Sequence, residues 1–341
     1  MSNQSIDVHA AERKKDHIKL ALTSKVPAHN IDTRFEYEPL LAAHPINSEN
    51  LTIQFLNKKF NAPIWVSSMT GGTSMAAIIN QNLAKACGEF GLGMGLGSCR
   101  QLLYSDEYLA DFQLRKWIGD QPLYANLGIA QVEHLIKNKE VSKIRHLLSK
   151  LDANGLIVHV NPLQEWLQPE GDRFEVAPII TVQRLLDENI GSIIVKEVGQ
   201  GMGPASVEAL LKLPIDALDF AACGGTNFAL LEILRSASSI SDDYSRLAQV
   251  GHSAASMVMM INTITDTLAQ NELLCRQVII SGGISDFLDG YYLMEKIKLP
   301  AVYGQASGFL KHAQNSYEVL QEHISKQING LSLAKAYLKV V

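Results

Sequence analysis

Short apolar runs, many of them rich in β-branched residues, recur along the chain from residue 62 onward, and most end in small or glycine residues. The eight runs are APIWVSS (62–68), GLGMGLGS (91–98), PLYANLG (122–128), GLIVHVN (155–161), SIIVKEVG (192–199), ALDFAACGG (217–225), QVIISGG (277–283) and AVYGQAS (301–307). Strands that are apolar throughout are buried on both faces, which is typical of parallel sheets. We therefore interpret each run as a buried strand.

Segments long enough for a helix separate these runs. Examples are IINQNLAKACGEF (78–90), VSKIRHLLSKL (141–151) and PASVEALLKL (204–213). In the second segment Ile144, Leu147, Leu148 and Leu151 fall at the spacing of one helix face. Strands and helices therefore alternate along the chain.

The number and order of the strands predict the fold class. Eight strand–helix units predict a parallel, closed (β/α)8 TIM barrel over residues 63–341, after an N-terminal cap segment, residues 1–62. An open doubly wound sheet is the alternative. It is disfavoured because the glycines of GMGLGS (93–98) alternate within a strand, and no helix begins where a dinucleotide loop needs one.

One interval breaks the regular spacing. The sixth and seventh runs begin 60 residues apart, at 217 and 277, whereas the others begin 24 to 37 residues apart. The additional chain contains the polar stretch SASSISDDYSRL (236–247) and the methionine-rich stretch SMVMMINTI (256–264). We interpret the first as a mobile lid within an insertion at 227–255, and the second as a helix that faces the core.

Composition narrows the class of protein. The 341 residues are 47% apolar, with a net charge of −5, which excludes a disordered chain. No apolar run reaches the roughly 18 residues of a membrane-spanning helix, and the polar amino-terminal stretch has no signal core. We therefore expect no membrane partner. The four cysteines are far apart, so we expect free thiols and a cytoplasmic location. The mildly acidic balance argues against a nucleic-acid partner.

Catalytic groups in TIM barrels lie at the carboxyl ends of the strands. ISGGIS (280–285) and YGQASG (303–308) follow the last two strands, where small residues let backbone N–H groups approach a phosphate. Lys196 is costly inside the apolar run IIVKEVG unless it meets a negative partner, such as the N1–O2 edge of a reduced flavin. A structural pair with Glu197 is the alternative, although neighbouring strand residues point to opposite faces.

Polar residues also end the earlier strands. SSMTGG (67–72) offers hydroxyls and glycines that suit a planar ring, and Ser98 and Asn126 end the second and third strands. HVNPLQEW (159–166) places Gln164 and Glu165 after a proline turn on the same rim.

These motifs together resemble one family, the type 2 isopentenyl-diphosphate isomerases, over nearly the whole chain. The motifs that carry the resemblance are RKKDHI (13–18), PIWVSSMTGG (63–72), GSCR (97–100), ANLG (125–128), HVNPLQE (159–165), VKEVG (195–199), GGTNF (224–228), SGGI (281–284) and GQAS (304–307). The resemblance implies interconversion of isopentenyl and dimethylallyl diphosphate with reduced FMN and Mg²⁺, NADPH reducing the flavin. We also expect a homo-oligomer, a tetramer or octamer, because barrels with large caps often self-associate.

The resemblance assigns roles to individual positions. Those implied to bind the isoprenoid diphosphate are Arg13, Lys14, His17, Ser98, Cys99, Arg100, Asn161 and Gln164. Those implied to bind FMN are Ser68, Met69, Thr70, Gly71, Ser98, Asn126, Lys196, Thr226, Gly282, Gly283, Ala306 and Ser307. Glu165 is the implied Mg²⁺ ligand, which is sufficient because Mg²⁺ uses one or two carboxylates. His159, Gln164 and Lys196 are the catalytic candidates, with the flavin itself as the hypothesised acid–base group.

Four positions depart from the family pattern. Cys99 stands where glutamine is usual, Ala221 where serine is common, Phe228 where tryptophan is frequent and Ser285 where arginine is common. These departures affect the expected affinity and substrate preference rather than the fold.

Three other functions remain open. An FMN-dependent hydroxy-acid oxidase has the same barrel but needs a His–Arg pair after strand six, where this chain has ACGGTNF. A flavin-free nucleotide dehydrogenase would use Cys223 as nucleophile, without a neighbouring base. A catalytically inactive flavin-binding protein is the third.

Overall fold

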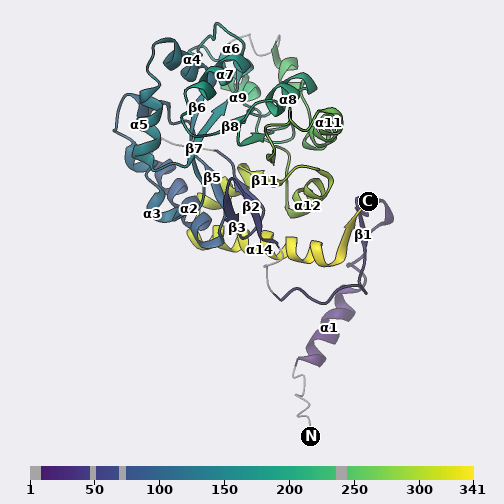
Figure 1. The fold of residues 1–341 in the computed structure, drawn as a ribbon. Coiled ribbons are helices and arrows are strands. Elements are labelled where there is room, and N and C mark those ends of the chain that lie inside the picture. The colour runs from purple at the N-terminus through teal and green to yellow at the C-terminus, as the bar shows by residue number, and fades with distance from the viewer. Residues whose placement is uncertain (1–8, 47–50, 69–73, 236–243) are drawn as a thin grey trace.

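A computed structural model describes residues 9–46, 51–68, 74–235 and 244–341 of the chain (Figure 1). Eight parallel strands close into a barrel in the order β10-β11-β4-β5-β6-β7-β8-β9. They are β4 (Ile64–Val66), β5 (Gly93–Gly95), β6 (Leu123–Gly128), β7 (Gly155–His159), β8 (Ser192–Lys196), β9 (Ala217–Asp219), β10 (Val278–Ser281) and β11 (Ala301–Gln305). Each lies inside one of the eight predicted runs, so the predicted TIM barrel is confirmed.

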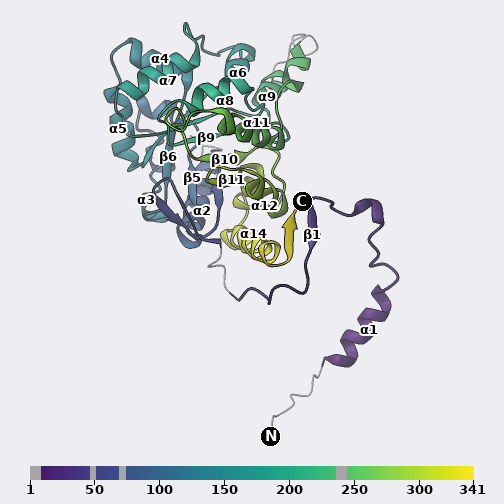
Figure 2. The same ribbon diagram turned by 45° about the vertical axis from the view of Figure 1, so that its right-hand side comes forward.

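Helices surround the barrel and cover the outer faces of its strands (Figure 2). They are α2 (Ser74–Phe90), α3 (Arg115–Ile118), α4 (Ile129–Lys137), α5 (Ser142–Leu151), α6 (Pro162–Leu167), α7 (Pro178–Asp187), α8 (Pro204–Leu211), α9 (Phe228–Arg235), α11 (Ala254–Thr267), α12 (Phe287–Lys296), α13 (Ser307–Ala313) and α14 (Tyr317–Tyr337). The helices predicted at 78–90, 141–151 and 204–213 are confirmed. In α5 the predicted apolar face packs inward through buried Ile144, Leu147 and Leu151. Within the described residues, no helix is both long and apolar enough to cross a membrane.

A hairpin fills the end of the barrel where the strands begin. Strands β2 (Ile53–Phe55) and β3 (Lys58–Phe60) pair antiparallel through a tight turn with positive φ at Leu56 and Asn57. Phe55 and Phe60 pack with Trp65 and other barrel residues in one buried cluster. The Leu56 N–H donates to Oε1 of Gln277, the residue before β10. The hairpin therefore lies at the end of the barrel where the strands begin. The loops that carry the candidate chemistry are at the opposite end.

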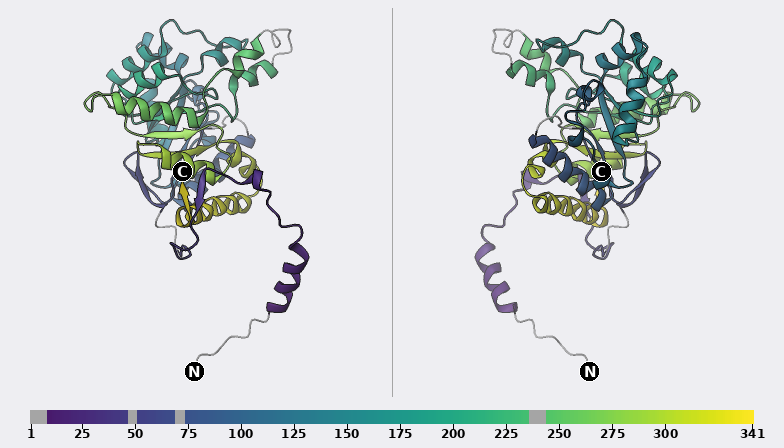
Figure 3. Two further views of the ribbon diagram at one scale, coloured as in Figure 1. Left: turned by 90° about the vertical axis from the view of Figure 1, so that its right-hand side faces the viewer. Right: turned by 90° about the vertical axis from the view of Figure 1, so that its left-hand side faces the viewer.

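The segment before the hairpin lies outside the barrel. Helix α1 (Ala10–Leu20) has no buried residue and stands apart from the barrel in every view (Figure 3). Strand β1 (Phe35–Tyr37) pairs antiparallel with β12 (Leu338–Val340) and so ties the segment before the barrel to the carboxyl-terminal strand. In segment 1–62, helix α1 therefore stands outside the barrel, β1 pairs with β12, and the β2–β3 hairpin fills the amino-terminal end of the barrel. The action of this segment as a cap over the rim stays a prediction.

Short 3-10 helices also lie in the described connections, among them η1 (Ala28–Asn30), η3 (Arg100–Leu103), η4 (Leu109–Asp111) and η5 (Ser245–Gln249). The expected insertion therefore contains α9, η5 and the chain leading to α11. Residues 236–243 of the expected lid lie outside the described residues, so its mobility stays a prediction. Helix α11 buries Met257, Val258 and Ile261, which confirms the core-facing helix, while Met259 is exposed.

Candidate active site

A cavity of about 220 Å³ lies at the barrel mouth, where the strands end. Its lining comes mainly from the loops after β4, β8, β9, β10 and β11, and includes Ser67, Ser68, Lys196, Thr226, Gly282, Gly283, Gln305, Ala306 and Ser307. Gly282 and Gly283 have φ of +87° and +72°, and a Cβ on Gly282 would lie 2.1 Å from the Ala222 carbonyl oxygen. Only glycine fits at 282, so a narrow backbone cradle follows β10.

Several buried polar atoms around this cavity have no hydrogen-bond partner among the described residues. They include Oγ of Ser67 and Ser68, Oε1 of Gln305 and Oδ2 of Asp219. Buried polar groups without partners are costly and rare, so each calls for an explanation. Three of the four belong to residues that line the cavity, and a ligand with polar edges would satisfy them.

Lys196 is buried at the end of β8, and its Nζ donates to the Glu197 carbonyl oxygen at 2.6 Å. The Glu197 carboxylate instead accepts N–H bonds of 2.6 Å from Gly199 and Gln200. The side chains thus diverge, as their positions in the strand predict.

Asp219 is a buried acid on β9. It pairs directly with Lys196 in the register of β8 and β9. Burial raises the pKa of Asp219, and the charge of Lys196 and a hydrogen bond from Ser281 oppose that rise. Sequence reasoning missed Asp219, although an acid inside the run ALDFAAC was a signal equal to that of Lys196.

His159, which ends β7, carries no charge at neutral pH. Burial, followed by the charge of Lys196, lowers its pKa from 6.5 to about 3. Its Nδ1 lies 2.7 Å from Oδ1 of Asn126, and Nδ2 of Asn126 donates to the Leu96 carbonyl oxygen. Because Oδ1 can only accept, Nδ1 bears the proton and Nε2 is the ring atom able to accept one.

Glu165 is buried in α6, and both of its oxygens are held. Oε1 accepts a bond of 3.1 Å from Nδ2 of Asn161, and Oε2 accepts one of 2.7 Å from the backbone N–H of Asp172. The same Asn161 amide donates to Oε1 of Gln164 at 3.0 Å, which orients the glutamine. Oδ1 of Asn161 is buried without a partner. A carboxylate beside an unpartnered amide oxygen suits a hard divalent cation.

The sequence Ser98-Cys99-Arg100 follows β5 and separates into exposed and buried groups. Arg100 is half-exposed, and its Nη1 forms an ion pair of 2.8 Å with Oδ2 of Asp172. The Cys99 thiol is fully buried, and burial raises its pKa to about 12. Any contribution of Cys99 to substrate binding therefore comes from its backbone. Asp172 is a second residue that sequence reasoning missed.

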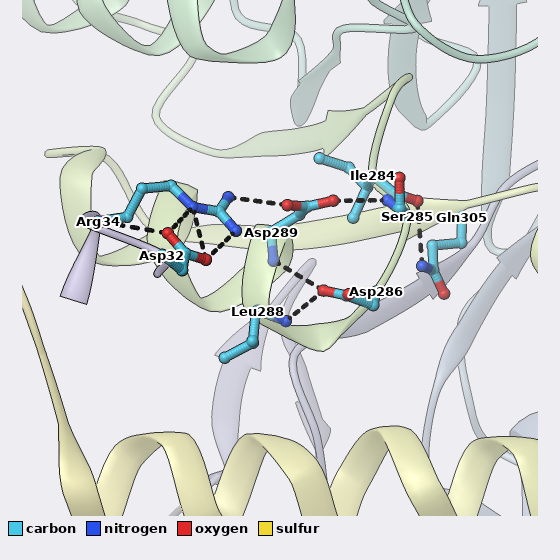
Figure 4. Close-up of polar contacts among 8 residues, drawn as sticks. All are labelled: Asp32, Arg34, Ile284, Ser285, Asp286, Leu288, Asp289 and Gln305. Carbon is cyan, nitrogen blue, oxygen red and sulfur yellow. Dashed lines mark hydrogen bonds and ion pairs between the residues drawn. The ribbon is translucent and has the colours of Figure 1, made fainter. Parts of the chain in front are cut away.

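The basic residues of the amino-terminal segment are not brought to the mouth. Arg13, Lys14 and His17 are exposed on α1, which stands apart from the barrel. Arg34 nevertheless fixes the root of this segment beside the cradle (Figure 4). Its guanidinium bridges Asp32 and Asp289 at 2.7 and 2.8 Å, and Asp289 accepts the N–H of Ser285 at 2.9 Å. The segment thus leaves the barrel next to the candidate phosphate loop.

The predicted flavin residues divide into three groups. Ser68, Lys196, Thr226, Gly282, Gly283, Ala306 and Ser307 line the mouth cavity together. Met69, Thr70 and Gly71 lie outside the described residues. Ser98 follows the end of β5, whereas Asn126 lies within β6 rather than at its end as expected, and neither residue lines the cavity.

A larger cavity of about 610 Å³ lies outside the barrel wall, between α7 and α8. Its lining is mainly apolar, and it shares Asn161 and Gln164 with the rim of the candidate site.

Comparison with known proteins supplies the family. The isopentenyl-diphosphate delta-isomerase of Rickettsia felis is 33% identical over 337 residues, covering 97% of this chain and 92% of that protein. The enzyme of the same name from Rickettsia conorii is 33% identical over 339 residues, covering 98% and 94%. The chain belongs to the isopentenyl-diphosphate delta-isomerase family. No family model matches it.

Solved structures support the architecture of this family member. A flavocytochrome b2 variant with sulfite bound superposes with a TM-score of 0.59 at 12% identity, covering 89% of this chain and 72% of that one. A mandelate oxidase variant with (S)-mandelic acid gives a TM-score of 0.56 at 10% identity, covering 90% and 87%. At such low identity the likeness shows the fold alone.

Proposed function

We propose that this family member is the type 2, FMN-dependent isomerase, which interconverts isopentenyl and dimethylallyl diphosphate with reduced FMN and Mg²⁺, NADPH supplying the reducing equivalents. The observation that carries the proposal is the mouth cavity, which combines a glycine cradle, unpartnered polar atoms and a buried lysine. A planar cofactor with a phosphate and polar ring edges would have a group to match each of these three features.

The mouth residues fit FMN in two parts. Gly282, Gly283, Ala306 and Ser307 would hold the phosphate through backbone N–H groups, aided by α13, whose helix begins at Ser307. Ser68, Thr226 and Lys196 would surround the ring, with Lys196 as the cation that stabilises its negative edge. Asn126 and Ser98 extend the same face. When bound, reduced FMN supplies an electron-rich ring that stabilises positive charge developing on the alkene.

The diphosphate half of the site is built from charged side chains. Arg100 would bind the diphosphate, joined by Arg13, Lys14 and His17 when α1 comes over the mouth. Glu165, with the amide oxygen of Asn161, would hold Mg²⁺ against the diphosphate oxygens.

The chain's own polar groups position the reacting alkene. Gln164, fixed by Asn161, would face the C5 unit and exclude water from it. Neutral His159, held by Asn126, offers Nε2 as an acceptor and does not compete as a cation with the charge of Lys196. These groups order the site, because double-bond transposition needs one proton added and another removed at fixed carbons.

An anaerobic assay tests this function. The protein is loaded with FMN, reduced by NADPH or dithionite and given each C5 diphosphate in turn, with and without Mg²⁺. We expect isomerisation in both directions that requires reduction and Mg²⁺. Reduced, metal-supplied protein without isomerisation would refute the proposal. Oxidation of 2-hydroxy acids would then indicate the oxidase, and flavin binding alone would indicate an inactive binding protein.

The proposed assembly and location complete this function. We propose a cytoplasmic homo-oligomer, a tetramer or octamer, in keeping with a basic helix that buries none of its residues on its own barrel. Sedimentation analysis of the full chain tests the assembly, and a monomer would contradict it.

A further inference from the structure

Asp172 connects three segments at the barrel mouth. Its Oδ2 accepts a hydrogen bond of 2.8 Å from Nε2 of Gln131 and forms the ion pair of 2.8 Å with Arg100. Its backbone N–H donates to Oε2 of Glu165 at 2.7 Å. A single residue therefore links the loop after β5, the beginning of α4 and helix α6, and it joins the candidate diphosphate cation to the candidate metal ligand.

The loop that carries Asp172 is fixed independently of Arg100. Nη1 of Arg173 donates to the Glu165 carbonyl oxygen at 2.5 Å, and its guanidinium lies 4.6 Å from the ring centroid of Trp166. A Cβ on Gly171 would lie 1.9 Å from the same carbonyl oxygen, so the loop packs directly on α6. Arg100, whose side chain is 53% exposed, is therefore the partner that can turn away.

This arrangement has a consequence for charge. With its guanidinium on Asp172, Arg100 presents no net attraction to an anion, and a diphosphate that approaches it also meets the carboxylates of Asp172 and Glu165. Two like unit charges about 4 Å apart near a protein surface repel strongly enough to weaken binding of the free diphosphate. A divalent cation held by Glu165 reverses the sign of the field at that point.

We propose that Asp172 is a charge lock on Arg100, which makes the site select the metal–diphosphate complex over the free diphosphate. The proposal rests on the function proposed above. Asp172 holds Arg100 until a metal-bound diphosphate arrives; Arg100 then turns to the phosphate oxygens. Asp172 is thus a specificity-determining residue that acts through Arg100 and is not itself a catalytic residue.

Calorimetric titration with inorganic pyrophosphate tests the lock without any isomerisation. The FMN-loaded full chain is titrated with and without Mg²⁺, as wild type and as Asp172→Asn, which keeps the backbone N–H to Glu165 and removes the charge. We expect Asp172→Asn to bind free pyrophosphate about 3- to 10-fold more tightly than wild type. The gain for the Mg²⁺ complex should be smaller, because Arg100 is released in both cases but the complex carries less negative charge to be repelled by Asp172.

Two further variants separate the lock from a general charge effect. Glu175→Gln removes an acid from the same loop, where Glu175 pairs with Lys137 at 2.6 Å, and we expect it to leave pyrophosphate binding within about twofold of wild type. In an Arg100→Met background, Asp172→Asn should lose its effect, because the lock acts through Arg100.

Each contrary result has a distinct meaning. Free pyrophosphate bound no more tightly by Asp172→Asn than by wild type would overturn the lock, and so would an equal or larger gain in affinity for the Mg²⁺ complex. Either result together with intact isomerisation by the wild type leaves the proposed function standing. Wild-type protein that binds neither form of pyrophosphate and does not isomerise would overturn both proposals.

Discussion

The two halves of the mouth are built by different means. Around β10 and β11 the site is made of backbone and glycines, and its dimensions are set by contacts of the barrel itself. Beyond β5 and β7 it is made of long charged side chains, held by ion pairs and hydrogen bonds between loops. The first half is preformed for its ligand, whereas the second can rearrange. A residue change should therefore affect the two ligands separately.

The largest expected effect is at the cradle. Gly282→Val would place a branched Cβ 2.1 Å from the Ala222 carbonyl oxygen at a φ of +87°. We expect FMN affinity to fall by at least about 100-fold, measured by quenching of flavin fluorescence. The matched control is Gly308→Ala in the same lining, where an added Cβ has its nearest neighbour at 4.0 Å and binding should be kept. Equal losses in both variants would refute a preformed cradle.

The next effect is on the charged half. Glu165→Gln should lower kcat/KM by about 100-fold and raise the Mg²⁺ concentration needed for half-maximal activity, because a neutral amide is a poor ligand for a hard cation. The flavin absorption spectrum and FMN affinity should stay unchanged. Steady-state assays at a series of Mg²⁺ concentrations measure both quantities. Unaltered metal dependence would remove Glu165 from this role.

A smaller effect concerns stability and pH at the boundary of the halves. Unfolded His159 takes up its proton near pH 6.5, whereas the folded group does so only near its lowered pKa of about 3. Below pH 6.5 the unfolded state therefore binds more protons, and stability falls as pH falls toward 3.

Between pH 7 and pH 5 this one group should cost about 2 kcal/mol of unfolding free energy. Urea unfolding at a series of pH values measures it. His159→Gln should flatten the slope, and His29→Gln, at an exposed position, should keep it. A slope unchanged in His159→Gln would contradict the neutral state of this partly buried imidazole.

The smallest effect is at the root of the amino-terminal segment. Arg34→Met removes the bridge between Asp32 and Asp289, whose side chains are 39% and 23% exposed. We expect KM for the diphosphate to rise about threefold, since partly exposed ion pairs contribute little energy, with FMN affinity kept. Arg145→Met, which breaks a pair with Glu188 elsewhere, is the control. A loss confined to FMN affinity would contradict a role in placing α1.

The sequence was sufficient for the barrel because its signal is local. Each buried strand is a continuous apolar run, so β8 and β10 can be found without knowing their neighbours. The opposite directions of Lys196 and Glu197 follow from the same local rule.

The site was less predictable because its pairs come from register and loop packing. Asp219 meets Lys196 only through the pairing of β8 with β9, and no pattern within either run specifies it. Asp172 lies in a polar loop that looks like any solvated turn, although it holds two candidate site residues. The inward direction of the Cys99 thiol likewise depends on the turn after β5.

The hairpin of β2 and β3 has a kinetic consequence. With Phe55 and Phe60 filling one end of the barrel, exchange at the described site takes place at the other end. The two ligands proposed to share that opening would be loaded in order, the deeper one first. The ligand that arrives second should therefore slow the escape of the first, an effect visible as a longer flavin residence time when pyrophosphate and Mg²⁺ are present.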